Sequence, residues 1–299
     1  MTNMSRTSPA WVGEWLDDEV DGRFSVSEGQ AHLQSLVDAL PDHNKIRYQN
    51  LTSMAITWMQ AADATKYVNA YTDTISVDQY LYCVPLCDWR PYPGSVFLKP
   101  IPEDTCRTSA SYGKVVDSLR MRDAEDGKLQ PVWNFIENVD QGSGYPLGPD
   151  ELKGAAMNSV IHEARGLIWF NQSFAGSCLS GNAIRVAQTT PSYPCASHIA
   201  AMGDVNNTIT ALAPVLNTQS YLWTFGPNLD TMLKAKDGYA YILAMTDEGT
   251  GNRTFALPSG ISGASVEVYG EGRSLAVTGS SFTDKFDTES TYHIYKIKI

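Results

Sequence analysis

The sequence has no long apolar run and few basic residues. None of its hydrophobic stretches approaches the roughly 18 residues that a membrane-spanning helix needs, so we expect no membrane insertion. The formal net charge of −11 argues against a nucleic-acid partner, because such binding depends on Lys and Arg side chains that neutralise phosphates. The segment from Met1 to Arg6 lacks the apolar core of a secretory signal. We therefore expect a soluble chain that is not exported by the classical route.

Cysteine is scarce, and several familiar catalytic motifs are missing. Five cysteines are an odd number, which excludes complete pairing within the chain, and we expect mostly buried thiols. Cys83 and Cys87 are spaced like the start of a zinc site, but no second Cys or His pair follows, so no metal is expected. There is no Gly-x-Ser-x-Gly elbow, His-Glu-x-x-His motif, phosphate loop or dinucleotide fingerprint, and we expect no cofactor.

Strand-like runs alternate with segments of helical periodicity over most of the chain. A capping-box pattern from Ser27 to Gln30 precedes apolar residues at helical spacing, and Pro149 with the acidic residues after it is typical of a helix first turn. Such alternation predicts a parallel α/β sheet with right-handed crossovers. The expected strands are 11–19, 46–50, 74–82, 130–137 and 166–170; the expected helices are 27–40, 53–71, 112–119, 149–160 and 209–216; long loops are expected over 83–108 and 171–203.

The pattern of the sequence changes from about Leu229. Short β-type runs are separated there by Gly-rich turns, a pattern typical of a small antiparallel sandwich. The predicted domains are residues 1–225 and 226–299. The expected strands of the second domain are 239–245, 253–257, 265–269, 274–277 and 292–297.

Two glutamates mark the predicted functional site. Glu19 and Glu137 each close an apolar, strand-like segment, so their carboxylates should emerge where strands end. In a parallel α/β barrel this edge carries the catalytic groups. Two carboxylates facing each other there can cleave a glycosidic bond, one as the acid and the other as the nucleophile or stabiliser.

Four motifs in order resemble clan A type glycoside hydrolases, which are retaining enzymes on a (β/α)8 barrel, often followed by a β-sandwich. Residues 15–19 (Trp-Leu-Asp-Asp-Glu) are similar to the strand-four motif, 73–80 to strand six, 131–137 to strand seven and 164–170 to strand eight. The resemblance implies an incomplete barrel, about strands four to eight, and a carbohydrate substrate. It makes Glu19 the acid/base and Glu137 the nucleophile. The substrate-binding residues that it implies are Asp18, Asn50, Asp78, Tyr80, Trp133 and Trp169.

The sequence departs from this family at two points. Asp18 stands where the family usually has Asn before the acid/base, and only about ten residues precede the strand-four motif. Strands one to three are therefore expected to come from elsewhere, because an open barrel leaves unpaired strand edges. We expect a second polypeptide, or another copy or a rearranged N-terminus of this chain, to cover the edge near residues 11–16.

Alternatives to an active enzyme remain open at this point. A glycosidase-like fold without turnover could serve as a structural or glycan-binding protein, and the layout also resembles glycosidase-like minor tail proteins of actinobacterial phages. Glu19 and Glu137 could be ordinary surface carboxylates, Trp169 could be barrel core, and Tyr80 could simply pack.

Overall fold

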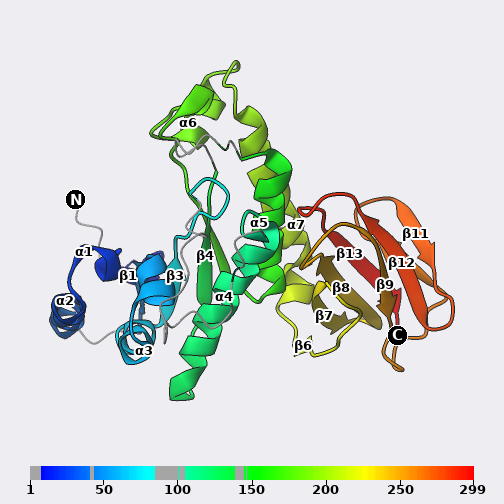
Figure 1. Cartoon of the computed structure of the whole chain (residues 1–299), viewed down its shortest axis with the longest axis horizontal. Helices are drawn as coiled ribbons and strands as arrows, with labels where there is room; N and C mark the ends of the chain where they lie inside the picture. Colours follow the sequence, from blue (N-terminus) through cyan, green and yellow to red (C-terminus); the bar gives the residue numbers. More distant parts are fainter. Residues whose placement is uncertain (1–7, 41–43, 85–100, 102–104, 139–144, 146) are drawn as a thin grey trace.

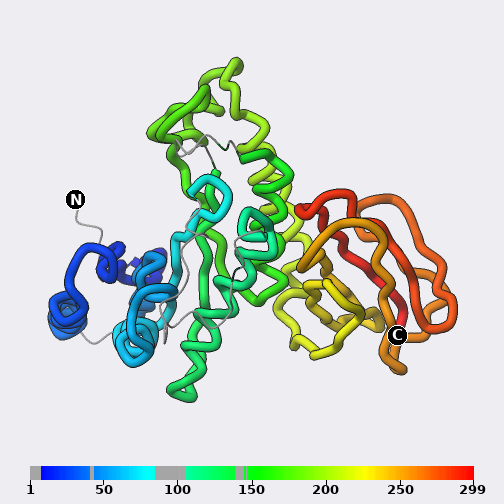
Figure 2. The backbone as a smooth tube through the Cα atoms, in the orientation of Figure 1, coloured from blue at the N-terminus to red at the C-terminus, as the bar shows by residue number. Residues whose placement is uncertain are grey.

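The structure is a computed structural model that describes residues 8–40, 44–84, 101, 105–138, 145 and 147–299; Cys87 lies outside them. A parallel sheet with its helices occupies one side of the molecule, and an antiparallel sandwich occupies the other (Figure 1). The backbone trace runs from the first described residues at one end to the sandwich at the opposite end (Figure 2). Within the described ranges, no helix is long and apolar enough to cross a membrane.

The parallel sheet has five strands in sequence order, which confirms the predicted α/β alternation. Each strand pairs in parallel with the one before it. The order never reverses, so the sheet winds in one direction like part of a barrel, unlike a doubly wound sheet with its switch point. The strands are β1 (Gly13–Asp18), β2 (Ile46–Leu51), β3 (Thr74–Val77), β4 (Val132–Ile136) and β5 (Gly166–Trp169).

Helices cover one face of this sheet. Ile75, Val77 and Ile136 point into the core that the helices complete, and Asn134 Nδ2 donates to Ser159 Oγ at 3.0 Å. The helical segments are α1 (Val20–Arg23), α2 (Val26–Ala39), the π-helical η1 (Met54–Trp58), α3 (Ala61–Asn69), α4 (Ser109–Asp123), η4 (Ala124–Asp126), α5 (Pro149–Ile161), η5 (Gly176–Cys178), α6 (Ala183–Thr189) and α7 (Ala196–Leu216).

The other face carries an aromatic row across neighbouring strands. Trp15 and Tyr48 have ring centroids 5.9 Å apart, and Tyr48 and Trp133 have theirs 5.1 Å apart. Gly166 makes room for this row, because a Cβ there would lie 2.7 Å from the Trp133 ring. Trp15 is 60% exposed. In the described sheet, β1 pairs only with β2 and β5 only with β4, so both outer strands keep an open edge.

Several local predictions were wrong. The capping box joins Ser25 to Glu28, with Ser25 Oγ donating to Glu28 Oε2 at 2.6 Å, two residues before the predicted position. The helix expected over 53–71 is interrupted between η1 and α3, and α6 and the start of α7 occupy the loop expected over 171–203. Cys178 and Cys195 form a disulfide, which corrects the expectation of mostly buried thiols.

The second part is an antiparallel sandwich. A six-stranded sheet, ordered β11-β10-β13-β8-β7-β6, faces the pair β12-β9. Stacked aromatic rings fill the space between them, with Phe255 and Phe282 centroids 4.7 Å apart. The first short strand lies just before the predicted boundary at residue 226. The strands are β6 (Ser220–Tyr221), β7 (Asp230–Lys236), β8 (Tyr239–Met245), β9 (Gly251–Ala256), β10 (Ser265–Val268), β11 (Arg273–Ala276), β12 (Ser281–Phe286) and β13 (His293–Lys298).

A histidine joins the two parts. His162, at the end of α5, forms ion pairs with Asp117 of α4 at 3.0 Å and with Asp230 of β7 at 3.2 Å. Burial alone would lower the pKa of His162, but the two aspartates raise it to about 10. The imidazolium therefore stays charged at neutral pH and links the helical layer to the sandwich.

Candidate active site

The carboxyl ends of the parallel strands bring the predicted polar residues together. Asp18 ends β1 and Glu19 follows it; Asn50 is near the end of β2; Asp78 follows β3 and Glu137 follows β4. Parallel pairing sets these ends side by side at one edge of the sheet. With Tyr80, which follows β3 by three residues, the structure thus gathers six of the eight predicted site residues at this edge.

Glu19 stands in a constrained backbone conformation. Its φ of 51° lies in the left-handed region, which costs a non-glycine residue about 1 kcal/mol or more. Its backbone N–H donates to the Asn50 carbonyl at 3.0 Å, which fixes the turn from β1 into α1. Backbone strain of this kind is often found at functional sites.

The carboxyl groups of Asp78 and Glu19 interact directly. Burial and the neighbouring Glu19 carboxyl, with a smaller contribution from Asp18, raise the pKa of Asp78 to about 9. Two carboxylates at such close range cannot both be ionised without a large electrostatic cost. Asp78 therefore keeps its proton at neutral pH and supplies an acidic hydrogen beside Glu19.

Asn50 connects Asp18 to the open face of the sheet. Its amide nitrogen donates to Asp18 Oδ1 at 3.1 Å, and its carbonyl oxygen accepts from Ser76 Oγ at 2.7 Å. Ser76 Oγ in turn lies 2.7 Å from the Tyr48 hydroxyl. This chain of hydrogen bonds fixes the amide orientation of Asn50 and aims its nitrogen at the Asp18 carboxylate.

Tyr80 lies among all the predicted carboxylates. Burial, then the charges of Asp78, Glu137, Glu19 and Asp18, raise the pKa of its phenol far above the usual value. Its hydroxyl is buried and has no hydrogen-bond partner within the described residues. A buried donor without a partner is uncommon in native proteins and is expected where a ligand supplies the missing bond.

Glu137 is enclosed in this structure. Its side chain is 0% exposed. Oε1 accepts from the Tyr82 amide at 2.7 Å and from the Tyr112 hydroxyl, and Oε2 accepts from the Cys83 amide at 2.9 Å. Burial raises the pKa of Glu137, and these donors partly offset that rise. As placed, the carboxylate binds the turn after β3 and is not open to solvent.

The two tryptophans do not join the carboxylates. Trp133 is the second residue of β4 and lies four residues before Glu137, a displacement of about 13 Å along a strand. Trp169 packs against the helix-side core, and its Nε1 donates to Asn206 of α7 at 3.2 Å. The sugar-stacking role expected for Trp169 does not fit this position, because its side chain points away from the open face.

Sequence reasoning gave no role to several residues at this edge. Ser76 belongs to β3, and Asp78 follows that strand two residues later. The alternation of strand side chains therefore places both on one face. The groups that donate hydrogen bonds to Glu137 come from the turn after β3 and from α4, and no local sequence pattern indicates them. Asn138 is 0% exposed, and within the described part of the chain neither of its amide atoms has a hydrogen-bond partner.

No protein-family model matches the sequence, and no curated protein matches it either. Solved structures do match the fold. Amy13B of Eubacterium rectale aligns with a TM-score of 0.51 at 10% identity, over 94% of this chain and 59% of its own. A Bacteroides fragilis protein described as an alpha-galactosidase gives 0.51 at 10% identity, over 91% and 52%. A MutB variant in complex with sucrose gives 0.50 at 13% identity, over 91% and 59%.

These neighbours are clan A glycoside hydrolases, and at such low identity the likeness shows the fold alone. The chain has a glycosidase-like α/β fold followed by an antiparallel sheet. It spans only between half and three fifths of the length of these structures.

Proposed function

We propose that this chain carries the catalytic edge of a retaining glycoside hydrolase that acts on a polysaccharide or cell-envelope glycan. The observation that carries the proposal concerns the Tyr80 hydroxyl, which is buried and has no hydrogen-bond partner in the described residues. Burial and four carboxyl groups raise the pKa of this phenol. The Glu19 and Asp78 carboxyls interact beside it, and burial together with Glu19 raises the pKa of Asp78 to about 9. Such a pair at this polar edge of the sheet is suited to acid/base catalysis on a neutral sugar.

The proposed mechanism is double displacement. Glu19 donates a proton to the leaving oxygen while Glu137 attacks the anomeric carbon and forms a covalent glycosyl ester. Glu19 then takes a proton from water, which displaces Glu137 and releases the sugar with retained configuration. Asp78 holds Glu19 in register through their contact, and Asn50 orients Asp18 toward the sugar hydroxyls.

A partner completes the site in this proposal. Both outer strands of the described sheet have an open edge. Val12, just before β1, is 70% exposed, and Trp15 within β1 is 60% exposed. The neighbouring folds extend well beyond the part that this chain matches. A second polypeptide, or another copy of this chain, would pair with the edge near residues 11–16 and cover the aromatic row of Trp15, Tyr48 and Trp133.

The enclosure of Glu137 favours a second candidate function, glycan binding without turnover. With both oxygens occupied by the Tyr82 and Cys83 amides, Glu137 cannot reach a sugar carbon until that turn moves. In this case the protein would be a structural or glycan-binding component, and a place in a viral tail, suggested by its sequence layout, would suit it. The reported structural neighbours give no support to that location.

The rates of glycoside cleavage by carboxylate variants distinguish the two functions. The assembly in which the chain occurs is tested for release of reducing ends from envelope glycans and for cleavage of a panel of aryl glycosides. Glu137→Gln should abolish both reactions. Glu19→Gln should slow glycan cleavage by about 10²- to 10⁴-fold, the usual range for loss of an acid/base group, and should slow aryl glycosides with good leaving groups much less.

Glu248→Gln is the matched control, because Glu248 is exposed on the sandwich. Equal rates for Glu137→Gln and this control would refute the nucleophile. Glycan binding by the unmodified assembly, with no turnover of any substrate, would support the second function.

A further inference from the structure

A sandwich residue reaches the turn that encloses Glu137. Glu289 lies between β12 and β13, and its Oε1 accepts from the Tyr82 hydroxyl at 2.6 Å. Its Oε2 accepts from the Ser109 amide at 2.7 Å, at the start of α4. A carboxylate suits this place, because a helix N-terminus favours negative charge. One side chain therefore binds both elements that donate to Glu137.

Both elements donate hydrogen bonds to Glu137. The turn after β3 supplies the Tyr82 and Cys83 amides, and α4 supplies the Tyr112 hydroxyl. The Tyr82 and Tyr112 rings are stacked, with centroids 5.6 Å apart. A movement of Tyr82 therefore changes the donors on Glu137 directly.

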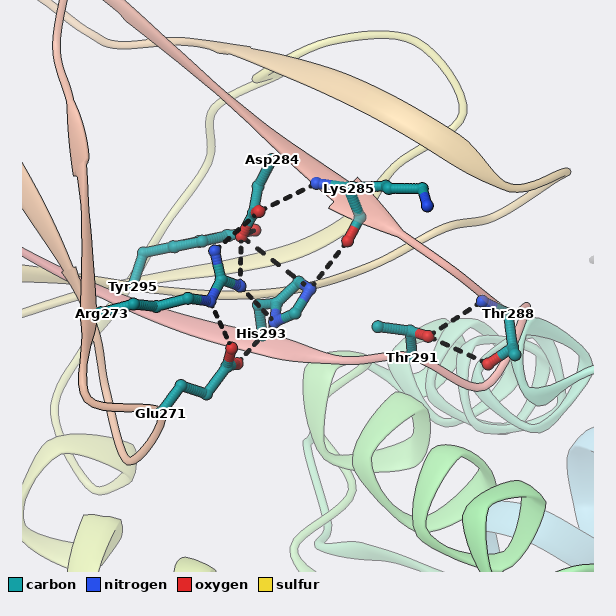
Figure 3. Close-up of polar contacts among 8 residues, drawn as sticks. All are labelled: Glu271, Arg273, Asp284, Lys285, Thr288, Thr291, His293 and Tyr295. Atoms are coloured by element: carbon teal, nitrogen blue, oxygen red, sulfur yellow. Dashed lines mark hydrogen bonds and ion pairs between the residues drawn. The ribbon is translucent and has the colours of Figure 1, made fainter.

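The turn that carries Glu289 is seated closely on the helices. A Cβ added at Gly154 of α5 would lie 2.3 Å from Ser109 Oγ and 2.8 Å from the Ser290 Cβ. The glycine thus permits a close approach of the Ser290 backbone to α5. Figure 3 shows the same turn, between Thr288 and Thr291, beside helices of the parallel domain.

A charge network fixes the two strands that lead into this turn (Figure 3). Arg273 donates from both terminal nitrogens to Asp284 of β12, at 2.8 and 2.7 Å, and from Nε to Glu271 at 2.7 Å. His293 of β13 lies 2.5 Å from Glu271 through Nδ1 and 3.1 Å from the Lys285 carbonyl through Nε2. Thr288 and Thr291 close the turn through a hydroxyl contact of 2.9 Å.

We propose that Glu289 is a positioning residue through which the sandwich holds the Tyr82–Cys83 turn on Glu137. Only the description of Glu137 as a nucleophile rests on the function proposed above; the enclosure of its carboxylate does not. The sandwich thereby controls access of a sugar to Glu137. Loss of the Glu289 contacts exposes the carboxylate without removing any group that touches substrate.

Hydrogen exchange of single backbone amides tests this inference on the full chain without any glycan. Glu289→Ala should speed exchange at the Tyr82 and Cys83 amides by about tenfold or more, the change expected from loss of one hydrogen bond to a charged group. Coupling of an amine to Glu137 by a carbodiimide, measured by peptide mass spectrometry, should rise in parallel. Glu248→Gln should change neither signal.

Two further variants separate positioning from general stability. Tyr82→Phe removes the hydroxyl and keeps the ring, so its effect should not add to that of Glu289→Ala in a double-mutant cycle. Gly154→Ala should reproduce the Glu289→Ala result by displacing the turn. An unchanged exchange rate at Tyr82 and Cys83, or an equal increase at amides throughout the chain, would overturn the proposal.

These outcomes are independent of catalysis. Faster exchange at Tyr82 and Cys83 supports the positioning role even where no glycan is cleaved. If cleavage occurs, the acidic limb of its pH profile should move to lower pH in Glu289→Ala, because burial raises the pKa of Glu137 and exposure reverses that effect.

Discussion

Replacement of Asp78 by Asn should change how the stability of the protein depends on pH. The pKa of Asp78 is raised from 3.8 to about 9, so the folded chain keeps a proton that the unfolded chain loses. The stabilisation is complete below the unfolded value and is lost as pH rises through about 9. Each pH unit inside this window costs about 1.4 kcal/mol, which amounts to roughly 3 kcal/mol between pH 6 and pH 8.

Urea unfolding at several pH values measures this effect. Asp78→Asn has no proton to lose, so its free energy of unfolding should fall less than that of the unmodified protein, by up to about 3 kcal/mol over this range. His162 changes stability in the same direction in both proteins and cancels in the comparison. Asp237, whose side chain is 79% exposed, provides the control variant Asp237→Asn. Parallel curves for the unmodified protein and Asp78→Asn would refute the raised pKa of Asp78.

Two other substitutions test the structure around the site. His162→Asn should lower the free energy of unfolding at pH 7 by about 3 kcal/mol, because it leaves Asp117 and Asp230 without their cation. The difference in unfolding free energy from the unmodified protein should shrink as pH rises through about 10, where the imidazolium of the unmodified protein also loses its proton. A difference that stays constant with pH in chemical denaturation would contradict the ion pairs of His162. Glu19→Gly should raise the thermal midpoint, with a gain of about 1 kcal/mol from relief of the left-handed φ, and should slow glycan cleavage as Glu19→Gln does. A lower midpoint would show that Glu19 is not strained.

The strand ends could be predicted from the sequence, while their surroundings could not. Glu19 and Asp78 follow short β-type runs, and parallel pairing alone brings such ends together. The enclosure of Glu137 depends on Tyr82 and Tyr112, which lie on separate elements and donate across the fold. Such contacts leave no local periodicity, so the same motif fits both an open and a closed carboxylate.

The errors also have physical reasons. Residues 166–170 are almost entirely apolar, as in a strand buried on both faces, so alternation could not assign Trp169 to one side. The missed strand β7 is rich in polar residues, with Asp230 bonded to Asn158 and Lys234 buried against Glu163. Cysteine spacing does not determine pairing, which left the disulfide between Cys178 and Cys195 unforeseen.

Covalent trapping tests the central claim most directly. The assembly that contains this chain is treated with a panel of 2-deoxy-2-fluoroglycosyl fluorides, which form long-lived esters with retaining nucleophiles, and its peptides are then analysed by mass spectrometry. The proposed function predicts one fluorosugar on the peptide that contains Glu137, absent in Glu137→Gln and retained in Glu248→Gln. A label on another carboxylate, or glycan cleavage with inverted configuration and no label, would contradict it.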